Sequence, residues 1–188
     1  MKSYFSNGKG WGKMSLYKRI LVGVDGSNEA EAAFRRAVQF VKAEEDAVLG
    51  IGFVADVRRI APLIDYEQTY AKKAKAYGEE LVEIYKQEAL RFGVQHIETF
   101  VHFGTPKSTL VRKILKNFQA DLIVVGATGL TQTEQALLGS VTDYVTRTAP
   151  CDVFIVKNDT NVTDSVSLGN AVFFVCKYKK LFDNIQLE

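Results

Sequence analysis

The sequence predicts one α/β domain in which a mostly parallel sheet carries helices on both faces. Short apolar runs rich in Val, Ile and Leu alternate along the chain with segments whose apolar residues recur every three or four positions. The continuous runs are typical of strands covered on both sides, and the longer spacing is typical of amphipathic helices. In such folds, ligands bind beyond the carboxyl ends of the strands.

Five apolar runs are expected to form an open, five-stranded sheet. The runs occupy residues 19–24, 47–54, 96–103, 121–125 and 153–156. The chain of 188 residues, 47% of them hydrophobic, is long enough for one sizeable core and does not require a second.

The first helix is expected to start at a capping residue, either Ser27 or Asn28. Thr105 followed by Pro106 predicts the start of another helix, with proline in its first turn. Each of these helices has one apolar stripe. The stripes are Ala30, Phe34, Ala37, Val38 and Val41 in the first helix and Val111, Ile114, Leu115 and Phe118 in the second.

A longer helix is expected between the second and third strands, ending near Gly93. Its apolar spacing is set by Tyr70, Ala74, Tyr77, Leu81, Ile84 and Phe92. The tyrosines of this region are interpreted as core or interface residues and not as a binding stripe. They are Tyr66, Tyr70, Tyr77 and Tyr85.

Composition excludes several classes of protein. The net charge of +2 is spread along the chain, which gives no indication of a nucleic-acid partner. Cys151 and Cys176 are far apart and form no CxxC pair, which favours a reducing compartment over a disulfide framework. Without a signal-peptide core or a run of about 20 apolar residues, no membrane span is expected and a cytoplasmic location is expected.

Both ends of the chain differ from the domain between them. Residues 1–15 are expected to form a flexible leader, and residues 158–188 a polar linker with a C-terminal extension. Within that extension, residues 171–176 are apolar and precede a basic cluster at Lys177, Lys179 and Lys180. A short strand or helix packed on the domain or on a partner is the favoured interpretation of this segment, and a basic amphipathic patch that contacts a membrane surface is the alternative.

The sequence places its strongest functional motif after the fourth strand. Gly126 and Gly129 follow the strand, and Gly139 and Ser140 stand where a helix is expected to begin. Glycines let backbone N–H groups approach an anion, and a helix N-terminus adds oriented donors and partial positive charge. Hydroxyl groups of Ser140 and Thr142 add further donors. This pattern predicts a phosphate-binding loop.

This pattern, Gly126-x2-Gly129-x9-Gly139-Ser140, together with Val24-Asp25-Gly26-Ser27, resembles the universal stress protein family. The resemblance covers residues 16–157. It implies a Rossmann-like fold of the adenine nucleotide alpha hydrolase type, a homodimer, and membership of the ATP-binding subclass. The expected function is therefore a nucleotide-dependent module in stress response or signalling.

The resemblance also implies which residues contact ATP. The four motif residues are expected to hold the phosphates and ribose, Asp25 to face the nucleoside, and the Val54 backbone to meet the adenine. The complete expected site is Gly23, Val24, Asp25, Val54, Val125, Gly126, Thr128, Gly129, Gly139, Ser140, Val141 and Thr142.

Thr128 stands where ATP-binding relatives often carry a basic residue or histidine. Positive charge in the loop is thereby reduced, and Mg²⁺ bound through the phosphates is expected to compensate. No metal site made by the protein is expected, because His96 and His102 have no further ligands at a recognisable spacing.

Catalytic residues are not indicated, so weak ATP hydrolysis is the most that is expected. Thr131 and Gln132 stand where a Walker loop needs glycine and lysine. Glu134 is interpreted as a solvated loop residue, and Asp25 as the one well-placed carboxylate if the protein is a hydrolase or transferase. The main alternative to an ATP-binding module is a nucleotide-independent scaffold that dimerises through the edge strand 153–156.

Overall fold

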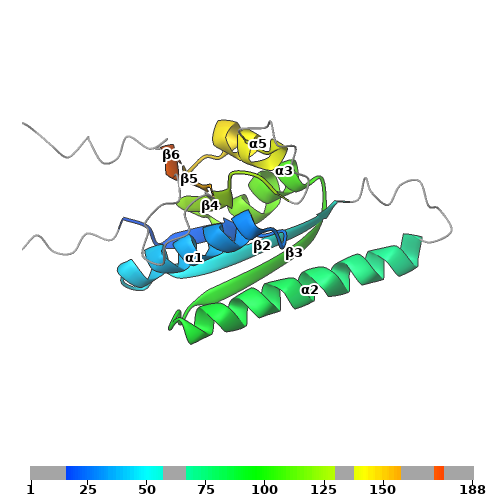
Figure 1. Cartoon of the computed structure of the whole chain (residues 1–188), viewed down its shortest axis with the longest axis horizontal. Coiled ribbons are helices and arrows are strands. Elements are labelled where there is room, and N and C mark those ends of the chain that lie inside the picture. Colours follow the sequence, from blue (N-terminus) through cyan, green and yellow to red (C-terminus); the bar gives the residue numbers. More distant parts are fainter. Residues whose placement is uncertain (1–15, 57–66, 130–137, 158–171, 176–188) are drawn as a thin grey trace, which may run out of the picture.

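The computed structural model describes residues 16–56, 67–129, 138–157 and 172–175. Helices cover both sides of one central sheet, as Figure 1 shows. The elements follow the order expected from the sequence and are β1 (Arg19–Gly23), α1 (Asn28–Ala43), β2 (Val48–Asp56), α2 (Glu67–Arg91), β3 (Ile97–Gly104), α3 (Pro106–Thr109), the π-helical segment η3 (Leu110–Leu115), α4 (Lys116–Phe118), β4 (Leu122–Gly126), α5 (Ser140–Thr148), β5 (Asp152–Val156) and β6 (Val172–Val175).

The sheet confirms the predicted fold and adds one strand to it. Its order is β3-β2-β1-β4-β5-β6, and the five strands predicted from the sequence are parallel. β6 pairs with β5 in the antiparallel direction, with Phe154 opposite Phe174. The expectation that strand 153–156 lies at an edge of the sheet is therefore wrong, because part of the predicted C-terminal extension covers it.

Two cores lie on opposite faces of the sheet. One core joins α1 and α2 to strand residues such as Ile20, Leu49 and Val124. The other joins η3 and α5 to alternate strand residues such as Leu21 and Ile123. Because side chains alternate between the two faces of a strand, a strand that is apolar throughout supplies both cores. Burial of both faces of each strand therefore explains the continuous apolar runs of the sequence.

α1 forms as its sequence predicts. The Ser27 hydroxyl accepts a hydrogen bond from the Ala30 N–H at 3.2 Å, which satisfies one of the free donors of the first turn. The predicted stripe residues are all buried, and Phe34 has no exposed surface. Glu29 and Glu31 add negative charge to the first turn, where the helix dipole favours it.

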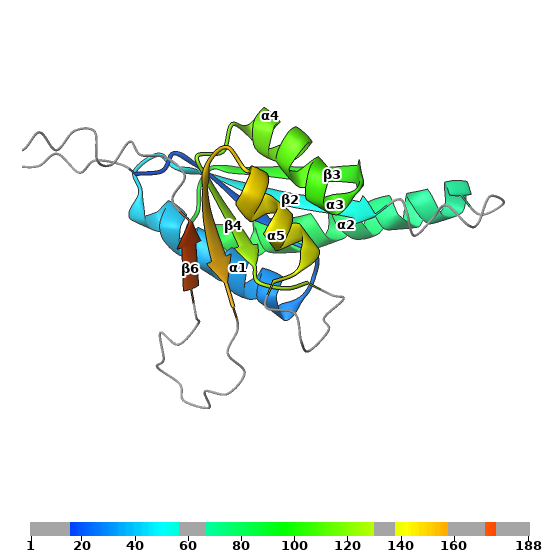
Figure 2. The same cartoon turned by 90° about the horizontal axis from the view of Figure 1, so that it is seen from above.

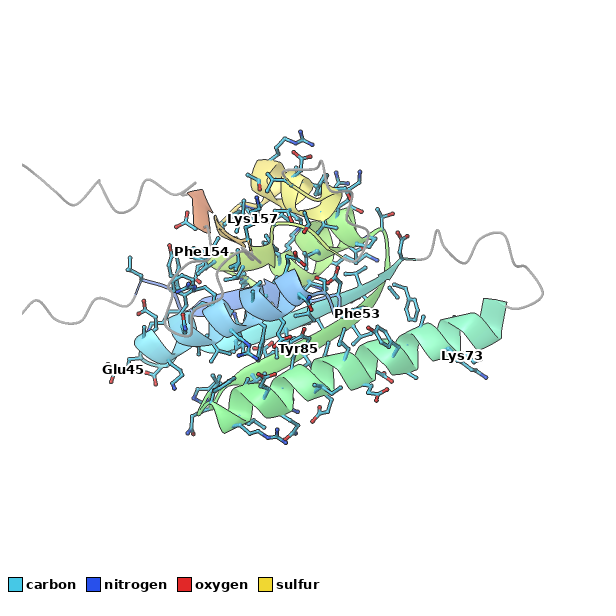
Figure 3. The ribbon with its side chains drawn as sticks, viewed as in Figure 1. Glu45, Phe53, Lys73, Tyr85, Phe154 and Lys157 are labelled. Atoms are coloured by element: carbon cyan, nitrogen blue, oxygen red, sulfur yellow. The ribbon has the colours of Figure 1, made fainter. Side chains whose placement is uncertain are left out.

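The predicted apolar face of α2 is confirmed only in part, because Ala74 and Leu81 pack against the core that contains α1 but three other predicted residues do not. Tyr77, Ile84 and Phe92 are 48%, 56% and 41% exposed, whereas Val82 and Tyr85 are buried. Gly78 explains the difference, since a Cβ there would lie 2.5 Å from Phe53 Cδ1. The helix therefore approaches the sheet most closely at its smallest residue, and the side chains on that face become the buried ones. Figure 3 labels Phe53 and Tyr85 from this layer.

The segment from α3 to α4 forms one helical stretch with a π-helical centre. Pro106 occupies the first turn as expected, and the Thr105 side chain makes no capping hydrogen bond. The predicted stripe is buried, including Ile114 at 0% exposure. Gln119, with a φ of 53°, ends the stretch in a left-handed conformation.

Candidate functional site

The predicted site residues gather where the central strands end. β1 and β4 are neighbours, with Val22 opposite Val124, so the turns that follow them lie at the same edge. After β1 the chain enters α1 on one face of the sheet, and after β4 it reaches α5 on the other. The junction of β1 and β4 is therefore a topological switch point, where open α/β sheets bind their ligands.

The turn after β1 is fixed by Asp25. Its Oδ1 atom accepts a hydrogen bond from the Ser27 N–H at 3.0 Å, two residues further along the chain. Gly26 between them has a φ of +86°, which glycine adopts without steric cost. The turn holds the Asp25 carboxylate beside the loop that follows β4, because a Cβ on Gly129 would lie 2.5 Å from Asp25 Oδ2.

The three motif positions require glycine for different structural reasons. A Cβ on Gly126 would lie 2.7 Å from Glu29 Cβ and 2.8 Å from the Glu29 carbonyl carbon, so this glycine lets the start of α1 pack on the end of β4. At Gly139, a Cβ would lie 3.2 Å from Thr128 Cα. Gly126 is therefore explained by packing alone, whereas Gly129 and Gly139 shape the surface of the loop.

The start of α5 is attached to this loop through backbone and hydroxyl groups. The Gly139 N–H donates to the Ala127 carbonyl at 2.7 Å, and the Thr142 hydroxyl donates to the Gly126 carbonyl at 2.6 Å. Thr142 is 4% exposed, so its hydroxyl serves the loop structure, whereas Ser140 is exposed. Gly139 is the N-cap residue and provides no side-chain cap, and the N–H groups at a helix start of this type are suited to an anion.

The remaining predicted residues lie around this junction at different depths. Val24 and Val125 are buried at 5% and 4% exposure and belong to opposite cores. A Cβ on Gly23 would lie 3.1 Å from Leu110 Cδ2, so that position is closely packed. Val54 and Val141 are half-buried against the core that contains η3 and α5. Residues 130–137, which include Glu134, lie outside the described residues.

Two side chains near the site were not among the predicted contacts. Tyr77 on α2 reaches the β1 turn, since a Cβ on Gly26 would lie 2.9 Å from its hydroxyl oxygen. Lys107 on α3 places its Nζ atom 5.9 Å from the ring centroid of Tyr144 on α5. Neither position follows from local sequence, because Tyr77 depends on how α2 packs beside the β1 turn and Lys107 on how α3 packs beside α5.

Asp25 of the β1 turn and Glu31 of α1 both act on Tyr85 of α2. Burial raises the pKa of Tyr85 to about 12, and the charges of Glu31 and Asp25 add to this shift. A neutral phenol is favoured over a phenolate where desolvation and nearby carboxylates both oppose the anion. The side of the junction that faces α2 therefore carries the charges of Asp25 and Glu31, whereas Lys107 lies near Tyr144 of α5 on the other face.

Together, the switch point, the glycine loop and the uncapped helix start define an α/β protein with a site suited to a phosphorylated ligand. The sequence model of the Universal stress protein family matches residues 16–157, and the chain belongs to that family. A Staphylococcus aureus (strain USA300) protein named for the same family is 42% identical over 146 residues, which cover 78% of this chain and 87% of the relative.

Solved structures agree with this assignment. The hypothetical protein MJ0577 is 28% identical with a TM-score of 0.70, and the match covers 76% of this chain and 97% of that one. The universal stress protein UspA from Lactobacillus plantarum is 31% identical with a TM-score of 0.58, over 74% and 97% of the two chains. A universal stress protein crystallised in complex with cAMP is 31% identical with a TM-score of 0.54, over 74% and 95%.

Proposed function

We propose that this universal stress protein binds ATP at the junction of β1 and β4. The observation that carries the proposal is the attachment of the α5 N-terminus to the glycine loop, through the 2.7 Å hydrogen bond from Gly139 to Ala127. This contact presents the first-turn N–H groups of α5 beside Thr128 and Gly129. Phosphates bound there would receive several backbone donors and the positive end of the helix dipole.

The charges around the junction suggest how the nucleotide is oriented. Asp25 lies beside Gly129 and repels phosphate, so it suits hydroxyl groups of the ribose. Lys107 lies near Tyr144 of α5, and Tyr144 is one helical turn from Ser140. Lys107 thus supplies the positive charge that the uncharged Thr128 lacks. Among the described residues, no group of three His, Cys, Asp or Glu side chains is arranged to hold a metal. Mg²⁺ would therefore be held by the phosphates.

The proposed role is nucleotide-dependent signalling in stress response, with slow hydrolysis or none. Asp25, the carboxylate best placed to act as a base, accepts a hydrogen bond from the Ser27 N–H, and this contact accounts for its position without catalysis. A ligand that binds one state of the protein more tightly shifts the population toward that state. ATP bound across β1, β4 and α5 would in this way alter the surface presented to a partner.

A matched pair of substitutions at Ser140 tests the site. Ser140 is exposed at the first position of α5. Ser140→Asp places a carboxylate among the proposed phosphate donors, while negative charge in the first turn favours the helix itself. Titration calorimetry should show ATP affinity reduced by at least about tenfold, equivalent to about 1.4 kcal/mol.

Ser140→Asn is the control, since it has the shape of Asp without the charge and also removes the hydroxyl. Its affinity should stay within about threefold of the wild type, a difference below about 0.7 kcal/mol. Equal affinities of the Asp and Asn variants would show that phosphate does not bind at α5. Absence of ATP binding by the wild type, and of nucleotide in mass spectra of the freshly purified protein, would favour a nucleotide-independent scaffold.

The complex of one structural neighbour with cAMP makes the choice of nucleotide a second measurement. ATP, ADP, AMP and cAMP should be titrated under the same conditions. Binding that strengthens with the number of phosphates supports the orientation toward α5, because each added phosphate extends the contact with N–H donors. Tighter binding of cAMP than of ATP would instead indicate that this chain shares the ligand of that neighbour's complex.

A further inference from the structure

The edge strand predicted from the sequence is covered in the structure by the chain's own β6. β6 runs antiparallel to β5, with Val153 opposite Val175 and Val156 opposite Val172. Figure 2 shows β6 lying alongside the outer side of β5. The pairing spans four of the five β5 residues, so β6 uses most of the backbone donors and acceptors that β5 would otherwise present.

β6 is an addition to the domain that the family shares. The match to the family ends at residue 157, whereas β6 begins at Val172. β5 already pairs with β4 on its inner side, and its residues Val153 and Ile155 are buried in the core that contains α5. The family domain is thus complete on that side before β6 is added, and β6 contributes the pairing of the outer edge.

β5 without β6 would be well suited to pair with another strand. It contains no proline, and its central residues, Val153 to Val156, carry no charge that would oppose pairing. Phe154 is half-buried, and its ring packs edge-on against Phe40 of α1 at 4.8 Å, which fixes this part of the strand. A rigid, apolar and unprotected edge is the type of surface to which a strand from another chain adds.

We infer that β6 is an autoinhibitory strand that covers the β5 edge and prevents a second copy of this chain from pairing there. A second copy is the partner excluded, because two identical β5 edges can pair antiparallel about a twofold axis. β6 in the same chain competes at a high effective concentration, since it is joined to β5 by the residues between Val156 and Val172. Release of β6 exposes the edge and favours the dimer.

Proline substitution in the full-length chain tests this role of β6. In a strand, successive N–H groups point to opposite sides, so Phe173→Pro with Phe174→Pro removes a pairing N–H whichever residue donates it. The control is Phe173→Val with Phe174→Val, which keeps both N–H groups and a high strand propensity. Light scattering at micromolar concentration should give equal masses for the wild type and control, and a doubled mass for the proline variant. Equal masses for all three proteins would overturn the inference.

A cysteine pair gives a second readout if the proline variant aggregates. Phe154 and Phe174 are opposite each other, and directly opposed residues of antiparallel strands lie within the Cα separation of a disulfide. Phe154→Cys with Phe174→Cys, in a background with Cys151→Ala and Cys176→Ser, should form a disulfide within one chain when diamide is added as oxidant. The cross-linked protein should stay monomeric. A disulfide between two chains, or no disulfide, would show that β6 does not occupy this edge.

Discussion

At the amino ends of the strands, charged and hydroxyl side chains tie neighbouring segments together, whereas at the carboxyl ends main chains approach one another at glycines. Asp121, just before β4, accepts hydrogen bonds from the backbone N–H groups of Lys18 at 2.7 Å and Arg19 at 3.1 Å. Tyr17 donates its hydroxyl to Asp152 Oδ2 at 3.0 Å, at the start of β5. Side chains from distant parts of the sequence thus hold the strand starts in register.

Arg19 adds further contacts at the amino ends. Its guanidinium donates to the Phe118 carbonyl, pairs with Glu98 at 2.8 Å and lies 4.2 Å from the centre of the Phe118 ring. At the carboxyl ends, Gly126 lets α1 pack on β4, and close approach at Gly129 and Gly139 shapes the β4 loop. The amino ends therefore serve stability, and the carboxyl ends, apart from Gly126, form the loop at which ligand contacts are proposed.

The largest expected effect concerns Gly126, which is an exception to this division because it lies at the carboxyl ends but is explained by packing against α1. Gly126→Ala places a methyl group 2.8 Å from the Glu29 carbonyl carbon, and this contact with backbone cannot be relieved by a side-chain rotation. Overpacking of this type should lower the free energy of unfolding by about 3 kcal/mol, measured by urea denaturation.

Gly129→Ala is the matched comparison at the same loop. Its added methyl group would meet the end of the Asp25 side chain, which can move away, so the loss of stability should be at most about 1 kcal/mol. Equal costs for the two alanine variants would show that α1 does not constrain β4 through Gly126.

The sequence was sufficient for the features that local chemistry determines. Hydroxyl placement and periodicity predict a helix cap at Ser27 or Asn28, the apolar strands and the stripe of α1. The structure confirms these features, with Ser27 as the cap. The motif also brings Gly129, Gly139 and Asp25 to one place, as expected from the order of strands and helices. Their contact with ATP remains a prediction.

Features that depend on long-range packing could not be predicted in the same way. The buried face of α2 is set by the approach of Gly78 to Phe53, and residues 25 positions apart in the sequence give no periodic signal of that approach. The apolar pattern of Val172–Val175 allowed a strand but did not identify β5 as its partner. For the same reason, Lys107 could not be placed beside Tyr144.

A smaller effect is expected at the amino ends, where stability should change without any change in ligand binding. Asp121→Ala removes the acceptor for the Lys18 and Arg19 N–H groups and should lower the free energy of unfolding by about 1–2 kcal/mol. Asp121→Asn keeps one acceptor oxygen and should lose about half as much. Titration calorimetry should give the wild-type ATP affinity for both variants, and a weakened affinity would contradict the separation of the two ends.

The smallest expected effect on stability, with a measurable effect on binding, concerns Lys107. The side chain lies over Tyr144 at 5.9 Å and makes a partly exposed contact, so Lys107→Gln should change the free energy of unfolding by less than about 0.5 kcal/mol. Loss of its charge beside α5 should weaken ATP binding about three- to tenfold at low ionic strength, and less at high salt, because screening already reduces the contribution of an exposed charge.

Lys107→Arg should restore the affinity, and Lys113→Gln, at an exposed lysine in η3, is the control for a change in net charge. If the Lys107 and Lys113 variants weaken binding equally, then net charge attracts the nucleotide and Lys107 has no particular place in its site.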